Sequence, residues 1–314
     1  MGRRADIAPR QIPSGLRAQE RLGPTWADWL ARLPRLADEM LREWDLTEDG
    51  APMHGFCSLV IPVRAAAGQR AVLKLGYDGD DESQFEHLAL QGWHGSGAVQ
   101  LLRAEPGRRV MLLERLKARD LRSVSESEAC DVVAGLYPRL HVPAHPQLRS
   151  LTSYVERWAN ALNTLPSDAP VPRRLVGQAV ALAGDFVGDE RSTGTTIHGD
   201  LHFENVLAGD REPWLAIDPK PMSGDPHYEV APMLWNRWDE LVASGDVRSA
   251  VQRRFYRLVD GAGLDPDRAR DWVVVRMVLN AYWAIEDAGR ARTSLSNDDQ
   301  RWITRCIAIA KAVQ

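Results

Sequence analysis

The chain has 314 residues, of which 44% are hydrophobic and 26% are charged. These proportions allow a sizeable core and exclude an intrinsically disordered protein, and the length favours two lobes over one. A formal net charge of -4 argues against a nucleic-acid binder, because affinity for a phosphate backbone depends on clustered Lys and Arg side chains.

The three cysteines, Cys57, Cys130 and Cys306, have no CxxC spacing. This pattern predicts reduced thiols rather than a zinc site or a disulfide framework. No stretch approaches the roughly 18 apolar residues of a membrane span, and no apolar segment follows Met1-Gly2-Arg3-Arg4. We therefore expect a cytoplasmic protein that associates with neither membranes nor nucleic acid.

The first part of the chain reads as an arm, a helix and a group of strands. Residues 1–24 are rich in Pro, Gly and Arg and are expected to form a loosely held arm. Helical spacing runs from Thr25, a candidate N-cap, to Trp44, with a kink expected at Pro34. The segments that follow predict strands at 56–63, 71–75, 99–102 and 110–113. One helix is predicted among them, at 82–93.

Beyond Leu116 the strand signal nearly disappears. Helical patterns are predicted at 127–140, 151–162 and 174–187 and again from about residue 228, with a loop and two short apolar runs between 196 and 218. Strands followed by helices predict an α+β fold with two lobes. We place a strand-rich lobe at 1–116 and a larger helical lobe at 117–314.

One segment of the helical part carries a catalytic pattern. His198-Gly199-Asp200-Leu201-His202-Phe203-Glu204-Asn205 matches the kinase catalytic loop H-R-D-L-x-x-x-N, with Gly in place of Arg. In this chemistry the carboxylate of Asp200 faces an acceptor hydroxyl, and the amide of Asn205 reaches a metal ion. Asp218 follows a short apolar run, where kinases hold the aspartate that coordinates Mg²⁺. The pattern predicts ATP and Mg²⁺ as cofactors.

The small lobe supplies candidates for holding the nucleotide. Lys74, in the run Ala71-Val72-Leu73-Lys74-Leu75, resembles the lysine that contacts the α- and β-phosphates. Its expected partner is Glu86 on the following helix, with Glu82 as the alternative.

Two further segments are weaker candidates for nucleotide contacts. Gly55 and Ser58 could let backbone N–H groups approach phosphate, or they could belong to an ordinary hairpin turn. Backbone groups of Glu114, Arg115 and Leu116, in the connector to the helical lobe, are candidates for the adenine edge.

The motifs together resemble the aminoglycoside phosphotransferases, and most closely the aminoglycoside/hydroxyurea antibiotic resistance kinases. The likeness covers most of residues 50–290 and is carried by residues 198–207, Ile217-Asp218-Pro219-Lys220, Gly224-Asp225-Pro226 and Tyr228-Glu229-Val230-Ala231-Pro232. It implies a protein-kinase-like fold and transfer of the ATP γ-phosphate to a hydroxyl group, with streptomycin 6-phosphotransferase as the best-known activity. It also implies that Asp200 is catalytic and that Asn205 and Asp218 bind metal.

Substrate contacts are predicted from charge. Lys220 could touch the transferred phosphate or a substrate oxygen. A cationic, guanidinium-bearing acceptor needs carboxylates, because guanidinium groups pair bidentately with them. The candidates that we retain are Asp225, Glu229, Glu286 and Asp287.

Two other functions remain possible at this point. One is a metabolic kinase for a sugar or an amino alcohol. The other is a catalytically silent nucleotide-binding module, which the presence of Lys74, Asp200, Asn205 and Asp218 disfavours. A protein kinase is disfavoured because no A-P-E signature follows Asp218.

Overall fold

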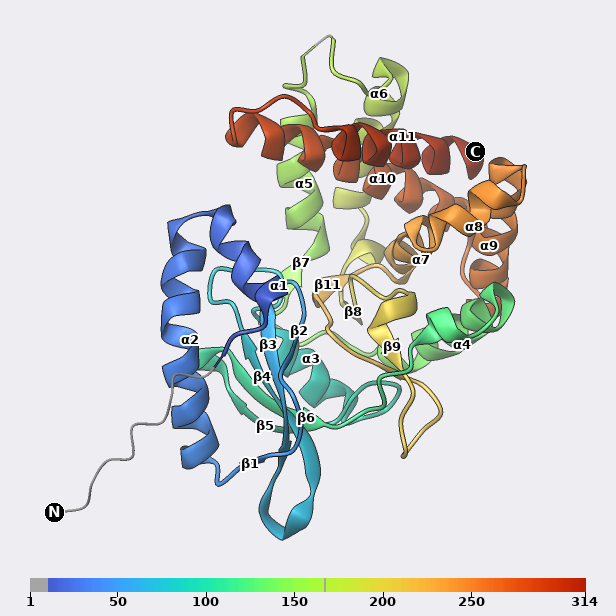
Figure 1. The fold of residues 1–314 in the computed structure, drawn as a ribbon. Helices are drawn as coiled ribbons and strands as arrows, with labels where there is room; N and C mark the ends of the chain where they lie inside the picture. Colours follow the sequence, from blue (N-terminus) through green and yellow to red (C-terminus); the bar gives the residue numbers. More distant parts are fainter. Residues whose placement is uncertain (1–10, 167) are drawn as a thin grey trace, which may run out of the picture. The chain divides into compact units, whose positions relative to one another are not determined.

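The structure, a computed structural model, describes residues 11–166 and 168–314 (Figure 1). Its contacts divide the chain into a first unit, residues 1–95 with 99–117, and a second unit, residues 96–98 with 118–314. None of the helices in the described ranges is long and apolar enough to cross a membrane.

The first unit is built on an antiparallel sheet with the strand order β1-β3-β4-β6-β5, in which β2 also pairs with β3. Its strands are β1 (Thr47–Glu48), β2 (Met53–His54), β3 (Ser58–Arg64), β4 (Arg70–Gly76), β5 (Leu101–Glu105) and β6 (Val110–Glu114). Its helices are α1 (Ser14–Arg17), α2 (Pro24–Glu43) and α3 (Glu86–Trp93). The predicted hairpin is present: β3 and β4 pair from Ser58↔Gly76 to Arg64↔Arg70.

Helix α2 begins before its predicted N-cap and is not interrupted at Pro34, where the kink stays a prediction. It begins at Pro24, whose missing N–H costs nothing in the first turn, and it continues through Pro34. Gly23 is the N-cap, so Thr25 lies inside the first turn, and its hydroxyl accepts a hydrogen bond from the Tyr77 hydroxyl at 2.7 Å. Trp26 stacks on the Tyr77 ring, so this end of the helix is fixed to the end of β4.

The prediction of a loosely held arm was wrong for the described part of residues 1–24, and residues 1–10 lie outside the described ranges. Ile12 and Leu16 are buried in the same core as Leu33 of α2 and Leu73 of β4. The sequence did not identify these two residues as part of the core, because they lie in a segment rich in Pro, Gly and Arg.

The second unit is largely helical and contains two small sheets. Its helices are α4 (Glu126–Leu140), α5 (Leu151–Leu162), α6 (Arg173–Val187), α7 (Ala231–Trp235), α8 (Trp238–Ala243), α9 (Val247–Ala262), α10 (Pro266–Arg290) and α11 (Asn297–Ala312). Its strands are β7 (Arg149–Ser150), β8 (Thr195–Ile197), β9 (Val206–Leu207), β10 (Leu215–Ala216) and β11 (Met222–Gly224). In one sheet β11 lies between β7 and β8, and in the other β9 pairs with β10.

Replacing Leu16 with Ala tests whether the N-terminal segment belongs to the core. Leu16 is fully buried, so we expect the free energy of unfolding to fall by about 3 kcal/mol. Urea denaturation monitored by tryptophan fluorescence measures the change. Leu22→Ala is the control, because Leu22 is exposed and should change stability little. Equal stability of the two variants would contradict the buried position of Leu16.

Candidate active site

The predicted catalytic loop lies between β8 and β9, and backbone hydrogen bonds join it to the segment that carries Asp218. The N–H of Ile217 donates to the carbonyl of Asn205 at 2.9 Å, and the N–H of Lys220 donates to the carbonyl of His198 at 2.8 Å. Asp218 lies between these two bonds. Asn205 and Asp218 are therefore neighbours across the β9–β10 pair, as a shared metal site requires.

The side chain of Asp200 is partly exposed, at 19%, and faces two basic groups. Lys220 Nζ lies 3.6 Å from Asp200 Oδ2, and His202 Nε2 lies 3.9 Å from the same oxygen. Asn205 Nδ2 donates to the Asp200 carbonyl oxygen at 2.9 Å, which fixes the loop between the two residues. Three of the predicted residues, Asp200, Asn205 and Lys220, are thus brought together.

The structure explains why glycine replaces arginine in the motif. Gly199 has a φ of +80°, and a Cβ at this position would lie 2.3 Å from the carbonyl oxygen of Lys220. Only glycine accepts both the left-handed backbone and this close approach. The contact brings the Lys220 segment directly against the catalytic loop.

His198 is a buried residue whose role the sequence did not reveal. Its Nδ1 accepts a hydrogen bond from the N–H of Asp200 at 3.3 Å, so its Nε2 carries the proton and donates to the Ile217 carbonyl at 3.0 Å. Burial lowers the pKa of His198, which favours this neutral form. The ring ties the catalytic loop to the strand end that precedes Asp218.

Glu229, which was predicted to bind substrate, instead accepts hydrogen bonds from the backbone of the catalytic loop. Its carboxylate is fully buried and accepts the N–H groups of His198 and Gly199 at 3.0 and 2.6 Å. Burial by itself raises the pKa of Glu229, but the His141 ring and the loop N–H groups outweigh it and hold that pKa below its usual value. His141 Nε2 lies 3.8 Å from the carboxylate, an ion-pair rather than a hydrogen-bond distance.

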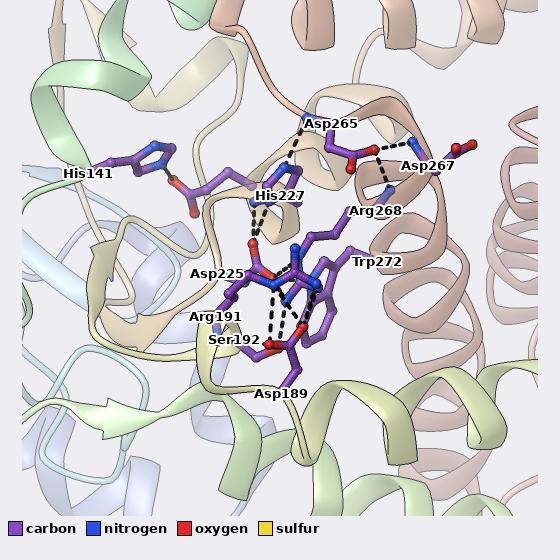
Figure 2. A network of polar contacts seen from close by, with 11 residues as sticks. His141, Asp189, Arg191, Ser192, Asp225, His227, Asp265, Asp267, Arg268 and Trp272 are labelled. Carbon is purple, nitrogen blue, oxygen red and sulfur yellow. Dashed lines mark hydrogen bonds and ion pairs between the residues drawn. The ribbon is translucent and has the colours of Figure 1, made fainter.

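Asp225, also predicted to bind substrate, is a buried structural carboxylate (Figure 2). It accepts hydrogen bonds from Trp272 Nε1 at 2.7 Å, Arg268 Nε at 2.6 Å and His227 Nδ1 at 2.6 Å. His227 Nε2 accepts from the N–H of Asp265, so the ring is neutral with its proton on Nδ1. Because protein groups occupy both carboxylate oxygens, the assignment of Asp225 and Glu229 to substrate is withdrawn.

This network reaches the catalytic loop through one short segment. Asp225 and His227 join α10 to the 3₁₀ turn Pro226–Val230, and that turn carries Glu229. Arg268 extends the network further, since its Nη1 donates to Asp189 at 2.7 Å and its Nη2 donates to Ser192 at 2.9 Å. The start of α10 therefore positions Glu229.

The pair predicted in the first unit is present. Lys74 Nζ lies 2.7 Å from both carboxylate oxygens of Glu86, and both side chains are buried. Since a buried charge needs a close partner, Glu86 fixes the position of the Lys74 ammonium beside β4. The geometry is that of the lysine and glutamate pair of kinases.

The segment of Gly55 and Ser58 forms the turn between β2 and β3. The N–H of Gly55 donates to the Ser58 carbonyl at 3.0 Å, as in a hairpin. The Ser58 side chain is buried, and within the described ranges its hydroxyl makes no hydrogen bond. A hydroxyl without a partner in the described residues suits contact with a ligand oxygen.

In the predicted adenine-binding connector, part of the backbone is already engaged. The N–H of Glu114 donates to the Gln100 carbonyl at 2.9 Å, so this donor is not available to a nucleotide. The Arg115 guanidinium binds Asp49 at 2.6 Å, which leaves only its backbone for an adenine contact. The assignment of backbone groups of Glu114, Arg115 and Leu116 to the adenine edge stays a prediction, without the Glu114 N–H.

Glu286 and Asp287 lie near the end of α10, and no contact joins them to Asp200 in the described part of the chain. Arg290 pairs with both, at 3.0 Å to Glu286 and 3.6 Å to Asp287. Their side chains are 30% and 71% exposed. Partial burial raises the pKa of Asp287, although most of its side chain is exposed. Their assignment to substrate stays a prediction.

The two units together define a class of protein. Solved structures with the same fold include aminoglycoside phosphotransferase APH(4)-Ia in a ternary complex with ADP and hygromycin B, with a TM-score of 0.58 and 16% identity over 88% of this chain and 97% of that one. Choline kinase LicA from Streptococcus pneumoniae has a TM-score of 0.59 and 10% identity, covering 89% and 99% of the two chains. The protein has the protein-kinase-like fold of small-molecule phosphotransferases, as predicted.

Sequence comparison identifies the family. Residues 43–288 match the aminoglycoside/hydroxyurea antibiotic resistance kinases, and the chain belongs to this family of enzymes. It is 42% identical to a streptomycin 6-kinase of Streptomyces glaucescens over 90% of this chain and 93% of the relative. It is 39% identical to a hydroxyurea phosphotransferase of Kitasatospora aureofaciens over 84% of this chain and 77% of the relative. The resemblance predicted from the motifs is confirmed.

Replacing Glu229 with Gln tests its role in holding the loop. Glutamine offers one oxygen, and its NH₂ group opposes the second loop N–H, so we expect the free energy of unfolding at pH 7 to fall by about 2–4 kcal/mol. Denaturation with urea measures this loss. Glu128→Gln is the matched control, because Glu128 is exposed on α4.

The same experiment has a pH dependence with a definite sign. Because the pKa of Glu229 is lowered by folding, its stabilisation is complete above the unfolded value of about 4.3 and is lost as the pH falls through the folded pKa. The difference between wild type and Glu229→Gln should therefore shrink in acid, below about pH 4. A difference that does not change with pH would contradict an ionised Glu229.

Proposed function

We propose that the protein transfers the γ-phosphate of ATP to the 6-hydroxyl of streptomycin. The observation that carries this proposal is the identity of 42–43% to two proteins named streptomycin 6-kinase, over at least 82% of this chain. The arrangement of Asp200, Asn205, Asp218 and Lys220 supplies the groups that such a transfer needs. A reaction that consumes ATP also supports a cytoplasmic location.

Asp200 is proposed to act on the acceptor. Its partly exposed carboxylate orients the hydroxyl and takes its proton as the bond to phosphorus forms. Lys220, 3.6 Å away, offers a positive charge to the developing phosphate. This position agrees better with a role at the transferred phosphate than with one at a distant part of the substrate.

The metal ligands are proposed to be Asn205 and Asp218. Asn205 uses its Nδ2 in the bond to the Asp200 carbonyl, so its Oδ1 is the amide atom left to act as a ligand. Two oxygen donors from the protein fit Mg²⁺, which keeps several waters and binds the phosphates as well. The described residues contain no group of three or more His, Cys, Asp or Glu side chains placed for a metal, which agrees with a site completed by the nucleotide. Bound Mg²⁺ would neutralise charge on the phosphates.

The nucleotide is proposed to use residues of the first unit. Lys74, held by Glu86, contacts the α- and β-phosphates, and the Gly55 turn with the Ser58 hydroxyl lies over them. Backbone groups of Arg115 and Leu116 bond the adenine edge. Each of these proposed contacts follows the pattern of nucleotide contacts in kinases, and the local geometry of the atoms is compatible with it.

A second acceptor, hydroxyurea, is favoured by one observation, the 39% identity to a hydroxyurea phosphotransferase. A sugar or amino alcohol has weaker support, because the choline kinase is only 10% identical and shares the fold alone. ADP release measured with streptomycin and with hydroxyurea separates the two leading acceptors.

The activity test uses Asp200→Asn. With streptomycin as acceptor we expect kcat to fall by about 10²–10⁴, because the variant cannot accept the proton, while the KM for ATP stays within about twofold. Coupled ADP release and mass spectrometry of the product measure the change. Asp298→Asn, on the exposed first turn of α11, is the control. An Asp200→Asn protein as active as this control would refute the mechanism, and a wild type that phosphorylates only hydroxyurea would refute the acceptor.

A further inference from the structure

One face of α10 gathers polar groups that lack a hydrogen-bond partner among the described residues. Asn280 is 95% buried, with a relative exposure of 5%, and within residues 11–166 and 168–314 its amide makes no hydrogen bond. Arg276, one turn earlier, makes no hydrogen bond or ion pair in the same ranges, and its Nε is enclosed. Largely buried polar side chains without a hydrogen bond are uncommon in folded proteins, so this pair calls for an explanation.

Aromatic side chains frame these two residues. The Arg276 guanidinium lies 4.9 Å from the ring centre of Tyr228 and 5.3 Å from that of Trp283. The hydroxyl of Tyr228 and Nε1 of Trp283 are also buried without a hydrogen-bond partner in the described residues. Four polar side chains that are short of partners thus lie around one stretch of α10.

The spacing of these residues produces a continuous stripe. Arg276, Asn280, Trp283 and Asp287 follow one another at intervals of four, three and four, so they share one face of the helix. At 1.5 Å per residue the stripe is roughly 16 Å long, enough for a molecule of several linked rings. Trp283 and Asp287 are not buried, so part of the stripe is open to solvent.

One end of the stripe is connected to the catalytic loop. Arg276 contacts Tyr228, and Tyr228 precedes Glu229, which binds the loop backbone. Near Trp283, the cluster extends to Tyr154 of α5, whose ring lies 5.9 Å from that of Trp283 and beneath the Arg149 guanidinium. Arg149 belongs to β7, in the same sheet as β8, which leads into the loop.

We propose that Arg276, Asn280 and Trp283 bind the acceptor along this face of α10 and determine which acceptor is used. Arg276 and Asn280 donate hydrogen bonds to its hydroxyl, ether or carbonyl oxygens, and Trp283 packs against the apolar face of a ring. Asp287 and Glu286 bind a cationic group at the outer end, where their exposed pairing with Arg290 is weak and easily replaced. The chemical class is a polyhydroxylated, multi-ring compound that carries a cationic substituent.

This inference rests on the proposed function and adds two residues, Arg276 and Asn280, that the motifs did not indicate. It also explains the order in which the types of side chain follow one another along α10. Donors lie at the end joined to the catalytic loop, an aromatic ring lies in the middle, and carboxylates lie at the far end. A small acceptor such as hydroxyurea would not span this stripe.

The discriminating variant is Asn280→Leu, which keeps the size of the side chain and removes its amide. We expect the KM for streptomycin to rise about three- to tenfold, with the KM for ATP unchanged, because only acceptor bonds are lost. We also expect Tm to stay the same or rise, because no hydrogen bond within the described residues is lost and an apolar side chain replaces a polar one at a largely buried position. A purely structural residue would instead lower Tm. Asn297→Leu, on the exposed first turn of α11, is the matched control.

A second variant and a binding measurement complete the test. Arg276→Met keeps the length of the stem and should also raise the KM for streptomycin about threefold or more. Calorimetric binding of streptomycin to Asp200→Asn, with and without Asn280→Leu, should show the same loss of affinity when no turnover occurs.

The outcomes separate this inference from the proposed function. A wild type that phosphorylates streptomycin, combined with Asn280→Leu and Arg276→Met variants whose KM matches the Asn297→Leu control, would overturn the stripe alone. A lower Tm with both KM values raised would also overturn it, in favour of a structural role. Absence of streptomycin phosphorylation by the wild type would count against the proposed function, and absence of binding to Asp200→Asn would count against the stripe.

Discussion

The buried carboxylate of Glu229 is the constraint on which the active site depends. A charge without solvent must be matched by donors, and Glu229 obtains two of them from consecutive residues of the catalytic loop. The left-handed backbone of Gly199 turns the chain sharply at this point and lets Lys220 pass close by. Asp200 follows directly, so its position is set by its neighbours' backbone rather than by its own side chain.

Helix α10 contributes both to the position of the catalytic loop and to the proposed acceptor site. Its first turns hold Asp225 through Arg268 and Trp272, and Asp225 begins the 3₁₀ turn that carries Glu229. Its later turns present Arg276 and Asn280, whose polar groups make no hydrogen bond within the described part of the chain. One rigid helix thus links the placement of the catalytic loop to the proposed binding of the acceptor, which favours precise alignment of a hydroxyl with Asp200.

Sequence reasoning succeeded where the signal is local. The loop around Asp200 and the pairing of Lys74 with Glu86 follow from short patterns whose spacing the backbone enforces. The prediction of substrate contacts failed for Asp225 and Glu229. The sequence does not show whether a carboxylate in a motif faces a ligand or the core. The sequence did not single out Asn280. The lack of a hydrogen-bond partner for its amide among the described residues can be recognised only in the folded structure.

The most direct test of the central claim is amide hydrogen exchange in the wild-type protein, measured at residue resolution for His198 and Gly199. If Glu229 binds both N–H groups, these amides should exchange as slowly as those of buried strands, although they lie in a loop. Exchange as fast as that of solvent-exposed amides without a hydrogen bond would show that the buried carboxylate does not hold the catalytic loop.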